Sequence, residues 1–247
     1  MSQPAIVSVL QCKGGVGKTT IATTLAACAH LAGFRTLLLD LEDPRHRGLS
    51  SMWFALRSPE STLRDLVTHL APDTWTAAHF TAVAAGYDFV VCDAPASLAR
   101  ATSAAAIASD FAVVPMLIGP AEIFALDPVA ELVNEVNRQR SKIGKIALPW
   151  ACSLNRVEVG TRENQAMAEQ LATRVDLLPA VLGDRIVYRR AIAAGECPLT
   201  YRPRDSAAAS ESWSLFEAVV ARTSLASRDL RVPIEPTKTK RTVRRAA

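Results

Sequence analysis

A short apolar run, Ala5–Leu10, leads directly into Gln-Cys-Lys-Gly-Gly-Val-Gly-Lys-Thr-Thr at residues 11–20. The apolar run predicts a buried strand, and the glycines after it leave the backbone open to unusual conformations. The sequence that follows predicts a helix over 19–32, whose positive N-terminus would point at an anion bound by the turn. Strand, glycine-rich turn and helix in this order predict a nucleotide-binding α/β fold.

The residues of the turn indicate phosphate binding. In loops of the pattern G-x-x-x-x-G-K-[ST], backbone N–H groups cradle the phosphates, the lysine reaches the β- and γ-phosphates, and the hydroxyl binds Mg²⁺. Cys12 replaces the first glycine of that pattern, and Lys13 adds a second lysine that the general pattern does not require. We expect the nucleotide to be held by Gly14, Gly15, Val16, Gly17, Lys18, Thr19 and Thr20.

Size and composition favour one compact domain. The chain has 247 residues, of which 49% are apolar, enough for an α/β domain with a substantial core. No apolar stretch approaches the roughly 20 uncharged residues of a membrane span, and the first residues lack the layout of a signal peptide, so we expect a cytoplasmic protein. The five cysteines are scattered singly, which argues against a disulfide framework or a zinc site.

Strand-like and helix-like segments alternate along the chain. Predicted strands cover 5–10, 36–41, 87–93, 110–116, 146–154 and 175–181. Predicted helices cover 19–32, 61–70, 74–85, 97–108, 123–140, 162–174 and 207–226. This alternation predicts a doubly wound, mainly parallel sheet with helices on both faces and ligands at the carboxyl ends of the strands. The phosphate-binding domain would span 1–226, followed by a basic, disordered tail at 227–247.

Carboxylates close two of the predicted strands. Asp93 ends the apolar strand that begins near Tyr87, and Asp40 ends the strand that begins at Thr36. A carboxylate at this position downstream of a phosphate-binding loop can hold Mg²⁺ through water. We therefore predict that Asp93 and the Thr19 hydroxyl form the metal site.

The segment Lys-Gly-Gly-Val-Gly-Lys-Thr at residues 13–19 resembles the deviant Walker A motif of the ParA/MinD family of P-loop NTPases. The resemblance implies an ATP-dependent homodimer in which Lys13 crosses to the partner subunit's nucleotide. It also implies ATP and Mg²⁺ as cofactors and Asp93 as the Walker B carboxylate. The residues after it, Ala94-Pro95-Ala96-Ser97, resemble the family's D-T-P-P-S switch with two small substitutions.

The acidic segment after the second strand departs from the family pattern. The family's D-x-D-P switch positions the attacking water and the Mg²⁺ shell, whereas this chain reads Asp40-Leu41-Glu42-Asp43-Pro44, one residue longer. Asp40 matches the first carboxylate and is predicted, with Lys13, to be catalytic. The second is Glu42 by spacing or Asp43 by its adjacency to proline. The longer switch leaves the hydrolysis rate open.

The resemblance extends over residues 5 to about 222. Leu154-Asn155-Arg156 resembles the segment in which asparagine reads the adenine edge, and an asparagine amide can both donate and accept as that role requires. The stretch from Gly183 to Glu196 resembles short ParA proteins that lack an N-terminal DNA-reading domain.

The basic charge gathers near the C-terminus. The chain carries a net charge of +4, whereas residues 222–247 alone hold eight Lys/Arg and two Asp/Glu. Such a segment favours sequence-independent, salt-sensitive contact with a phosphate backbone, although a solvated polar tail is the alternative. The predicted DNA-binding residues are Arg189, Arg190, Arg222, Lys238, Lys240, Arg241, Arg244 and Arg245.

The leading hypothesis is a nucleoid-associated, DNA-binding ATPase that segregates a plasmid or chromosome or positions another large cargo. A cargo-adaptor protein would stimulate its slow hydrolysis. One alternative is a ParA-like assembly factor for conjugative DNA transfer. A MinD-like membrane switch is disfavoured, because the last 15 residues offer only Ile234 and Val243 for an amphipathic helix. An iron–sulfur reductase relative would need a suitably placed cysteine pair, which the sequence lacks.

Overall fold

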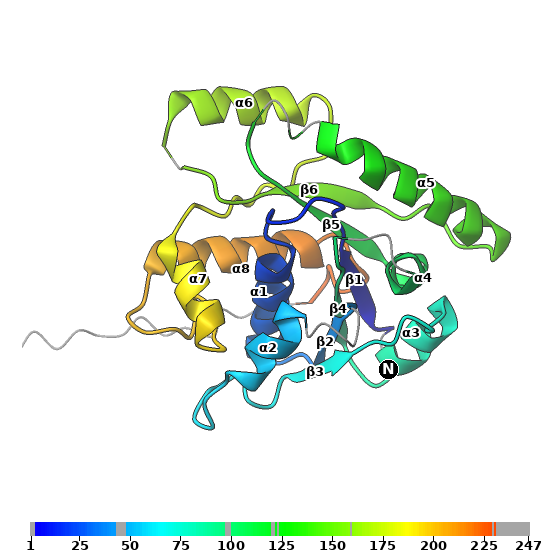
Figure 1. Ribbon diagram of the computed structural model, residues 1–247, viewed down its shortest axis with the longest axis horizontal. Coiled ribbons are helices and arrows are strands. Elements are labelled where there is room, and N and C mark those ends of the chain that lie inside the picture. Colours follow the sequence, from blue (N-terminus) through cyan, green and yellow to red (C-terminus); the bar gives the residue numbers. More distant parts are fainter. Residues whose placement is uncertain are drawn as a thin grey trace, which may run out of the picture.

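The computed structural model describes residues 3–42, 48–96, 100–119, 122, 124–158, 160–228 and 230. These residues form a sheet in the order β3-β2-β4-β1-β5-β6, and every pair of neighbouring strands is parallel (Figure 1). The strands are β1 (Ala5–Val9), β2 (Thr36–Asp40), β3 (Val67–Leu70), β4 (Phe89–Asp93), β5 (Phe111–Met116) and β6 (Trp150–Leu154). The predicted doubly wound parallel sheet is therefore confirmed.

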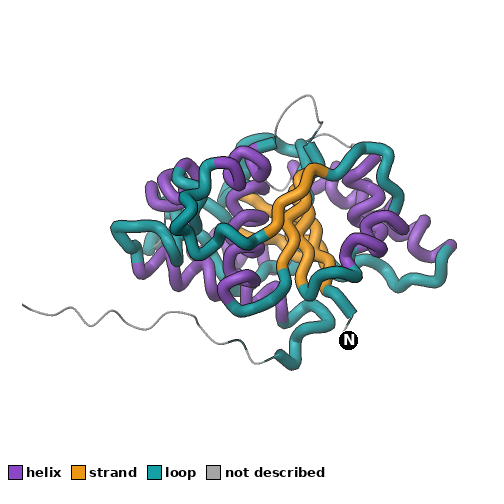
Figure 2. The backbone as a smooth tube through the Cα atoms, turned by 90° about the horizontal axis from the view of Figure 1, so that it is seen from below, coloured by secondary structure: helices purple, strands orange, loops and turns teal. Residues whose placement is uncertain are grey.

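Helices cover both faces of the sheet (Figure 2). One face carries α1 (Lys18–Leu31), α2 (Leu49–Ala55), α7 (Ile186–Ala193) and α8 (Ser206–Val220). The other carries α3 (Ala77–Ala84), α4 (Arg100–Ala108) and α5 (Asp127–Lys142). The 3₁₀ turn η2 (Phe124–Leu126) precedes α5, and α6 (Arg162–Ala172) follows β6.

The strands are apolar at nearly every position because both faces of the sheet are buried. Successive side chains point to opposite faces, so neighbours along one strand join different cores. Val7 packs in the core beneath α1 and α8, whereas Ile6 packs in the core beneath α3, α4 and α5. A third cluster lies between β6, α5 and α6. These cores hold the carboxyl ends of the strands in a fixed row at one edge of the sheet.

The helix predicted over 61–70 is wrong, because residues 67–70 form the edge strand β3. The spacing of Leu63, Leu66 and Leu70 fits a helical face, but only the two leucines at 63 and 66 are fully buried. Residues 67–70 instead pair with β2, from Leu37 opposite Val67 to Asp40 opposite Leu70. Pairing with the open hydrogen-bonding edge of β2 therefore outweighs the helical preference of the local leucine spacing.

The strand predicted over 175–181 is also wrong. This segment touches β6 through one isolated bridge, in which Cys152 N–H donates to Asp176 O at 2.7 Å and Leu178 N–H donates to Cys152 O at 2.8 Å. Pro179 follows and has no N–H to continue a ladder. The strand predicted from residue 146 begins only at Trp150, and the helices α2 and α7 were not predicted.

The described chain ends close to the core. Leu225 is fully buried and Leu230 packs against the core formed by α1 and α8. The tail predicted at 227–247 is described only at residues 227, 228 and 230, and Lys238, Lys240, Arg241, Arg244 and Arg245 lie outside the described residues. Within the described part, no helix is long and apolar enough to cross a bilayer.

Candidate nucleotide site

The loop between β1 and α1 is built for close approach of an anion. Gly15 and Gly17 have φ of +76° and +95°, a left-handed conformation that favours glycine. A Cβ on Gly17 would also lie 1.8 Å from Nδ2 of Asn155. No side chain caps the N-terminus of α1 and its first turn holds no acidic residue. Its N–H groups and positive end are therefore available to phosphate.

Lys18 lies at the start of α1 with its charge half-buried. Its Nζ donates to the carbonyl oxygen of Lys13 at 2.9 Å. Burial lowers the pKa of Lys18, and the nearby Asp93, Cys12 and Glu42 oppose that shift. A partly desolvated ammonium that relies on one carbonyl gains from an incoming phosphate, as the sequence predicts for this lysine.

Asp93 and Asp40 lie side by side at the ends of β4 and β2, directly opposite each other in the parallel ladder. Both are buried, with 5% and 1% of their surface exposed. Burial raises the pKa of Asp93 to about 6, hydrogen bonds from Ser50 and Thr19 oppose the shift, and the charge of Asp40 adds to it. Two adjacent buried carboxylates favour a nearby cation, because each negative charge makes the other harder to ionise.

The donor set fits Mg²⁺. Oδ1 of Asp93 is buried without a hydrogen-bond partner, while its Oδ2 accepts from the Ser50 hydroxyl at 2.7 Å. Together with the Thr19 hydroxyl this offers hard oxygen ligands beside the phosphate loop. Magnesium in such sites takes few protein ligands and completes its shell with water and phosphate oxygens. The structure thus brings the two predicted metal-site residues together.

Asp40 is held by α2, an element that the sequence did not predict. Its Oδ2 accepts from the N–H and the hydroxyl of Ser51, and its Oδ1 accepts from the N–H of Glu42. The charge of Glu42 raises the pKa of Lys18, so Glu42 lies close enough to the site to act on it electrostatically. Asp43 lies outside the described residues, so both candidates for the second carboxylate remain.

Lys13 makes an ion pair within its own subunit. Its Nζ lies 2.6 Å from Oε1 of Glu122, a residue that is only 8% exposed. The other carboxylate oxygen of Glu122 is buried without a partner. Sequence reasoning missed Glu122; its one signal is an isolated acidic residue in the apolar stretch after β5. The ammonium of Lys13 is therefore held by a carboxylate of its own chain.

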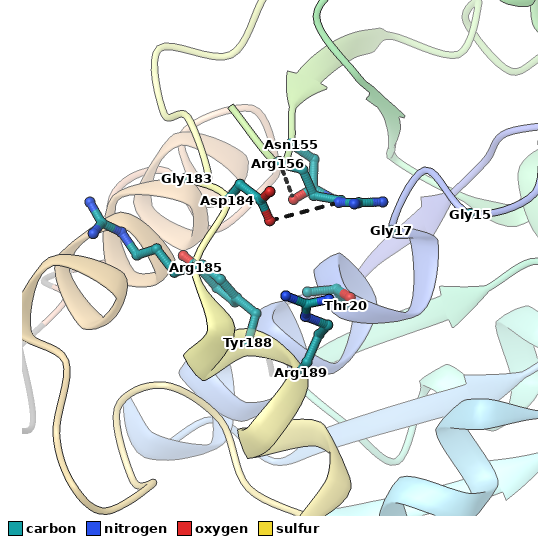
Figure 3. A pocket seen from close by; sticks show the side chains of 10 residues that line it. All are labelled: Gly15, Gly17, Thr20, Asn155, Arg156, Gly183, Asp184, Arg185, Tyr188 and Arg189. Carbon is teal, nitrogen blue, oxygen red and sulfur yellow. Dashed lines mark hydrogen bonds and ion pairs between the residues drawn. The ribbon is translucent and has the colours of Figure 1, made fainter. Parts of the chain in front are cut away.

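Asn155 supports the phosphate loop from the end of β6. Its Nδ2 donates to the carbonyl oxygen of Val16 at 2.8 Å, and its Oδ1 accepts from the N–H of Arg156 at 3.0 Å. It lies beside a cavity of about 210 Å³ (Figure 3). The cavity is lined by Gly15, Gly17, Thr20, Asn155, Arg156, Gly183, Asp184, Arg185, Tyr188 and Arg189. The cavity adjoins the phosphate loop through Gly15 and Gly17, and the role of Asn155 in reading adenine stays a prediction.

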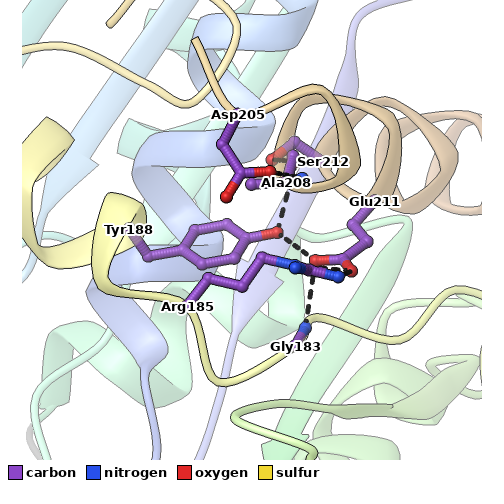
Figure 4. Close-up of polar contacts among 7 residues, drawn as sticks. All are labelled: Gly183, Arg185, Tyr188, Asp205, Ala208, Glu211 and Ser212. Atoms are coloured by element: carbon purple, nitrogen blue, oxygen red, sulfur yellow. Dashed lines mark hydrogen bonds and ion pairs between the residues drawn. The ribbon is translucent and has the colours of Figure 1, made fainter. Parts of the chain in front are cut away.

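A polar network joins one wall of this cavity, formed by Gly183, Arg185 and Tyr188, to α8 (Figure 4). Glu211 accepts from the guanidinium of Arg185 at 2.8 Å, from the hydroxyl of Tyr188 at 3.0 Å and from the N–H of Gly183 at 3.1 Å. Burial is the largest cause that raises the pKa of Tyr188 far above its ordinary value, so this hydroxyl stays protonated. The network gives the cavity a rigid wall.

The predicted DNA-binding arginines of the described part occupy different environments. Arg189 and Thr20 both line the cavity (Figure 3). Arg190 is exposed on α7. Arg222 forms an ion pair with Asp176 at 2.5 Å. Arg189 is thus within reach of the predicted nucleotide, a placement that the sequence did not predict.

Comparison with known proteins agrees with this geometry. The family model described as the CobQ/CobB/MinD/ParA nucleotide binding domain matches residues 7–199. The chain is 30% identical over 218 residues to the maintenance of carboxysome distribution protein A of Halothiobacillus neapolitanus, covering 87% of this chain and 95% of that protein.

Two solved structures share the fold. McdA of Cyanothece in complex with ATP has a TM-score of 0.68 and 16% identity, and the match covers 94% of this chain and 100% of that one. The putative plasmid partition protein of Borrelia burgdorferi bound to AMPPNP has a TM-score of 0.63 and 20% identity, with 89% and 99% covered.

Proposed function

The chain belongs to the CobQ/CobB/MinD/ParA family of nucleotide-binding domains, and we propose that it is an ATP-hydrolysing switch that dimerises on ATP and positions a large cargo on DNA. The observation that carries the proposal is the pair of lysines on one phosphate loop. The ammonium of Lys18 donates to the carbonyl oxygen of Lys13, whereas the ammonium of Lys13 forms an ion pair with Glu122 of its own subunit. Lys13 is therefore a candidate to contact a phosphate that is bound by another subunit.

In this mechanism the loop backbone and Lys18 bind the phosphates, and Thr19 and Asp93 hold Mg²⁺, the latter through water. A Mg²⁺ ion held there would supply positive charge that offsets the charge of the phosphates. Asp40 orients the attacking water. Lys13 leaves Glu122 and contacts the partner subunit's nucleotide, so that the γ-phosphate stabilises the dimer. Hydrolysis then releases the subunits, as in other nucleotide-controlled switches.

The DNA-binding part of the proposal rests on the basic residues and on the relatives. A backbone contact by arginine and lysine would be independent of sequence and sensitive to salt. Dimerisation would double the number of contacts and so couple the ATP state to DNA affinity. Relatives named for carboxysome distribution and plasmid partition support a cargo-positioning role. We propose a cytoplasmic, nucleoid-associated protein with a cargo adaptor that stimulates hydrolysis.

No observation favours the alternatives more. Among the described residues no group of three or more His, Cys, Asp or Glu side chains could hold a metal ion, and the cysteines are free. An iron–sulfur centre has no support from these residues.

The experiment that tests the proposal is binding to random-sequence DNA with ATP and with ADP across a salt series. We expect tight binding with ATP only, with an affinity that falls steeply as salt rises. Lys18→Ala serves as the control, since it should lose ATP-dependent binding. Equal binding with both nucleotides, or none with either, would contradict the DNA switch. Turnover of ATP, measured on the same samples, tests the ATPase separately.

A further inference from the structure

The first turn of α2 contacts both strand-end carboxylates through two adjacent serines. The Ser50 hydroxyl donates to Oδ2 of Asp93 at 2.7 Å, and Ser50 is fully buried. The Ser51 hydroxyl and N–H donate to Oδ2 of Asp40 at 2.6 and 2.9 Å. Each carboxylate therefore has one oxygen fixed by its own serine, which also sets the direction of the other oxygen.

The start of α2 packs closely against the carboxylate of Asp40. A Cβ on Gly48, the residue before α2, would lie 2.2 Å from Oδ1 of Asp40, so a larger residue at this position would displace that carboxylate. The helix itself is anchored in the core. Trp53 is fully buried and its Nε1 donates to the carbonyl oxygen of Glu196 at 2.9 Å. The guanidinium of Arg57 lies 4.1 Å from the centre of the Trp53 ring.

We propose that Ser50 and Ser51 are positioning residues for the nucleotide site, Ser50 for the metal-binding Asp93 and Ser51 for the water-orienting Asp40. The inference rests on the proposed ATPase function. Its physical basis is that a donor on a rigid helix fixes the rotamer of a carboxylate before substrate arrives, so that little reorganisation accompanies the reaction. The orphaned Oδ1 of Asp93 is then directed to the metal, as second-layer hydrogen bonds do for metal ligands in general.

Two neighbouring substitutions separate these roles. Ser51→Ala should lower kcat about tenfold, the effect of one hydrogen bond to a charged group, while the affinity for Mg²⁺ and ADP stays unchanged. Ser50→Ala should raise the Mg²⁺ concentration needed for half-maximal binding of a fluorescent ADP analogue several-fold, with a smaller effect on kcat. The two serines share one helical turn, so simple damage to α2 would affect both readouts in both variants alike.

Ser51→Thr keeps the hydroxyl and should restore most of kcat. In an Asp40→Ala background, Ser51→Ala should have no further effect, because Ser51 acts through Asp40. Unchanged kcat in Ser51→Ala, additive losses in the double variant, or unchanged or tighter Mg²⁺ binding in Ser50→Ala would each overturn the inference. Wild-type protein that turns over no ATP would instead refute the proposed function, and the Mg²⁺ titration would still test Ser50.

Discussion

Asp93→Asn should stabilise the protein while it weakens the metal site. Burial raises the pKa of Asp93 from its ordinary 3.8 to about 6, so the ionised carboxylate is less favourable in the folded chain than in the unfolded one. At about 1.4 kcal/mol for each pKa unit, the folded protein carries a penalty of about 3 kcal/mol above pH 6. Asparagine removes the charge and still offers an oxygen to the Ser50 hydroxyl.

We expect a gain of about 2 kcal/mol in the free energy of unfolding at pH 7.5, less than the full penalty because the new NH₂ group must find acceptors. For a domain of this size that is a rise in Tm of about 4–8 °C. Well below pH 3.8 Asp93 is protonated in both the folded and the unfolded state, so the penalty is absent there. The penalty grows as pH rises from about 3.8 to about 6 and is complete above that range. The gain should therefore shrink as pH falls from 7 toward 4.

The assay is urea unfolding of nucleotide-free protein in the presence of a chelator at several pH values. Asp65→Asn is the matched control, because the same chemical change is made on a side chain that is 77% exposed. Equal stability of Asp93→Asn and wild type at pH 7.5, or a gain that does not depend on pH, would refute the argument from burial.

Four further outcomes follow from the site. Lys18→Ala should lower ATP affinity at least about 100-fold in a fluorescent-analogue titration, since it removes a half-buried cation next to the phosphates. Lys13→Ala should bind ATP yet stay monomeric by sedimentation; ATP-induced dimers would exclude the cross-subunit role. Glu122→Gln should dimerise at several-fold lower ATP concentration, because Lys13 no longer has to leave an ion pair. An unchanged ATP concentration for dimerisation would show that the Lys13–Glu122 ion pair does not oppose dimerisation. Asn155→Ala should weaken ATP and GTP about tenfold through the loop, with a further loss for ATP alone; equal losses would limit Asn155 to loop support.

The parts of the site that could be predicted from the sequence are those set by local chemistry. Glycines with positive φ, a lysine and threonine at the helix start, and carboxylates that close apolar strands each show in a few consecutive residues. The parallel sheet then brings Asp40 and Asp93 together without further information. Glu122 is different, because it pairs with a lysine 109 positions earlier in the chain and nothing near it signals the contact.

The same distinction between local patterns and distant contacts explains the errors in the predicted fold. The leucines of residues 61–70 satisfy a helical period, and only the presence of β2 beside them makes β3 the better structure. Ser50 and Ser51 fall in a segment with no strong period of its own, and the short helix that carries them depends on Trp53 reaching a core built by distant residues. Local pattern therefore indicates candidate ligand-binding residues, whereas the residues that support them depend on contacts with distant parts of the chain.

The contacts that the charged site residues make within the subunit have a common consequence. Four charged residues of the predicted site have partners within the subunit: Lys13 contacts Glu122, Lys18 contacts a carbonyl oxygen, and Asp40 and Asp93 contact serines. Binding of nucleotide and a second subunit must exchange some of these contacts for new ones, so affinity is the difference between two sets of polar interactions. Removing an internal partner that is exchanged, such as Glu122, should therefore favour the ATP dimer. Removing one that is kept, such as Ser51, should weaken catalysis instead. The opposite signs of those two effects distinguish a contact that restrains the switch from one that prepares it.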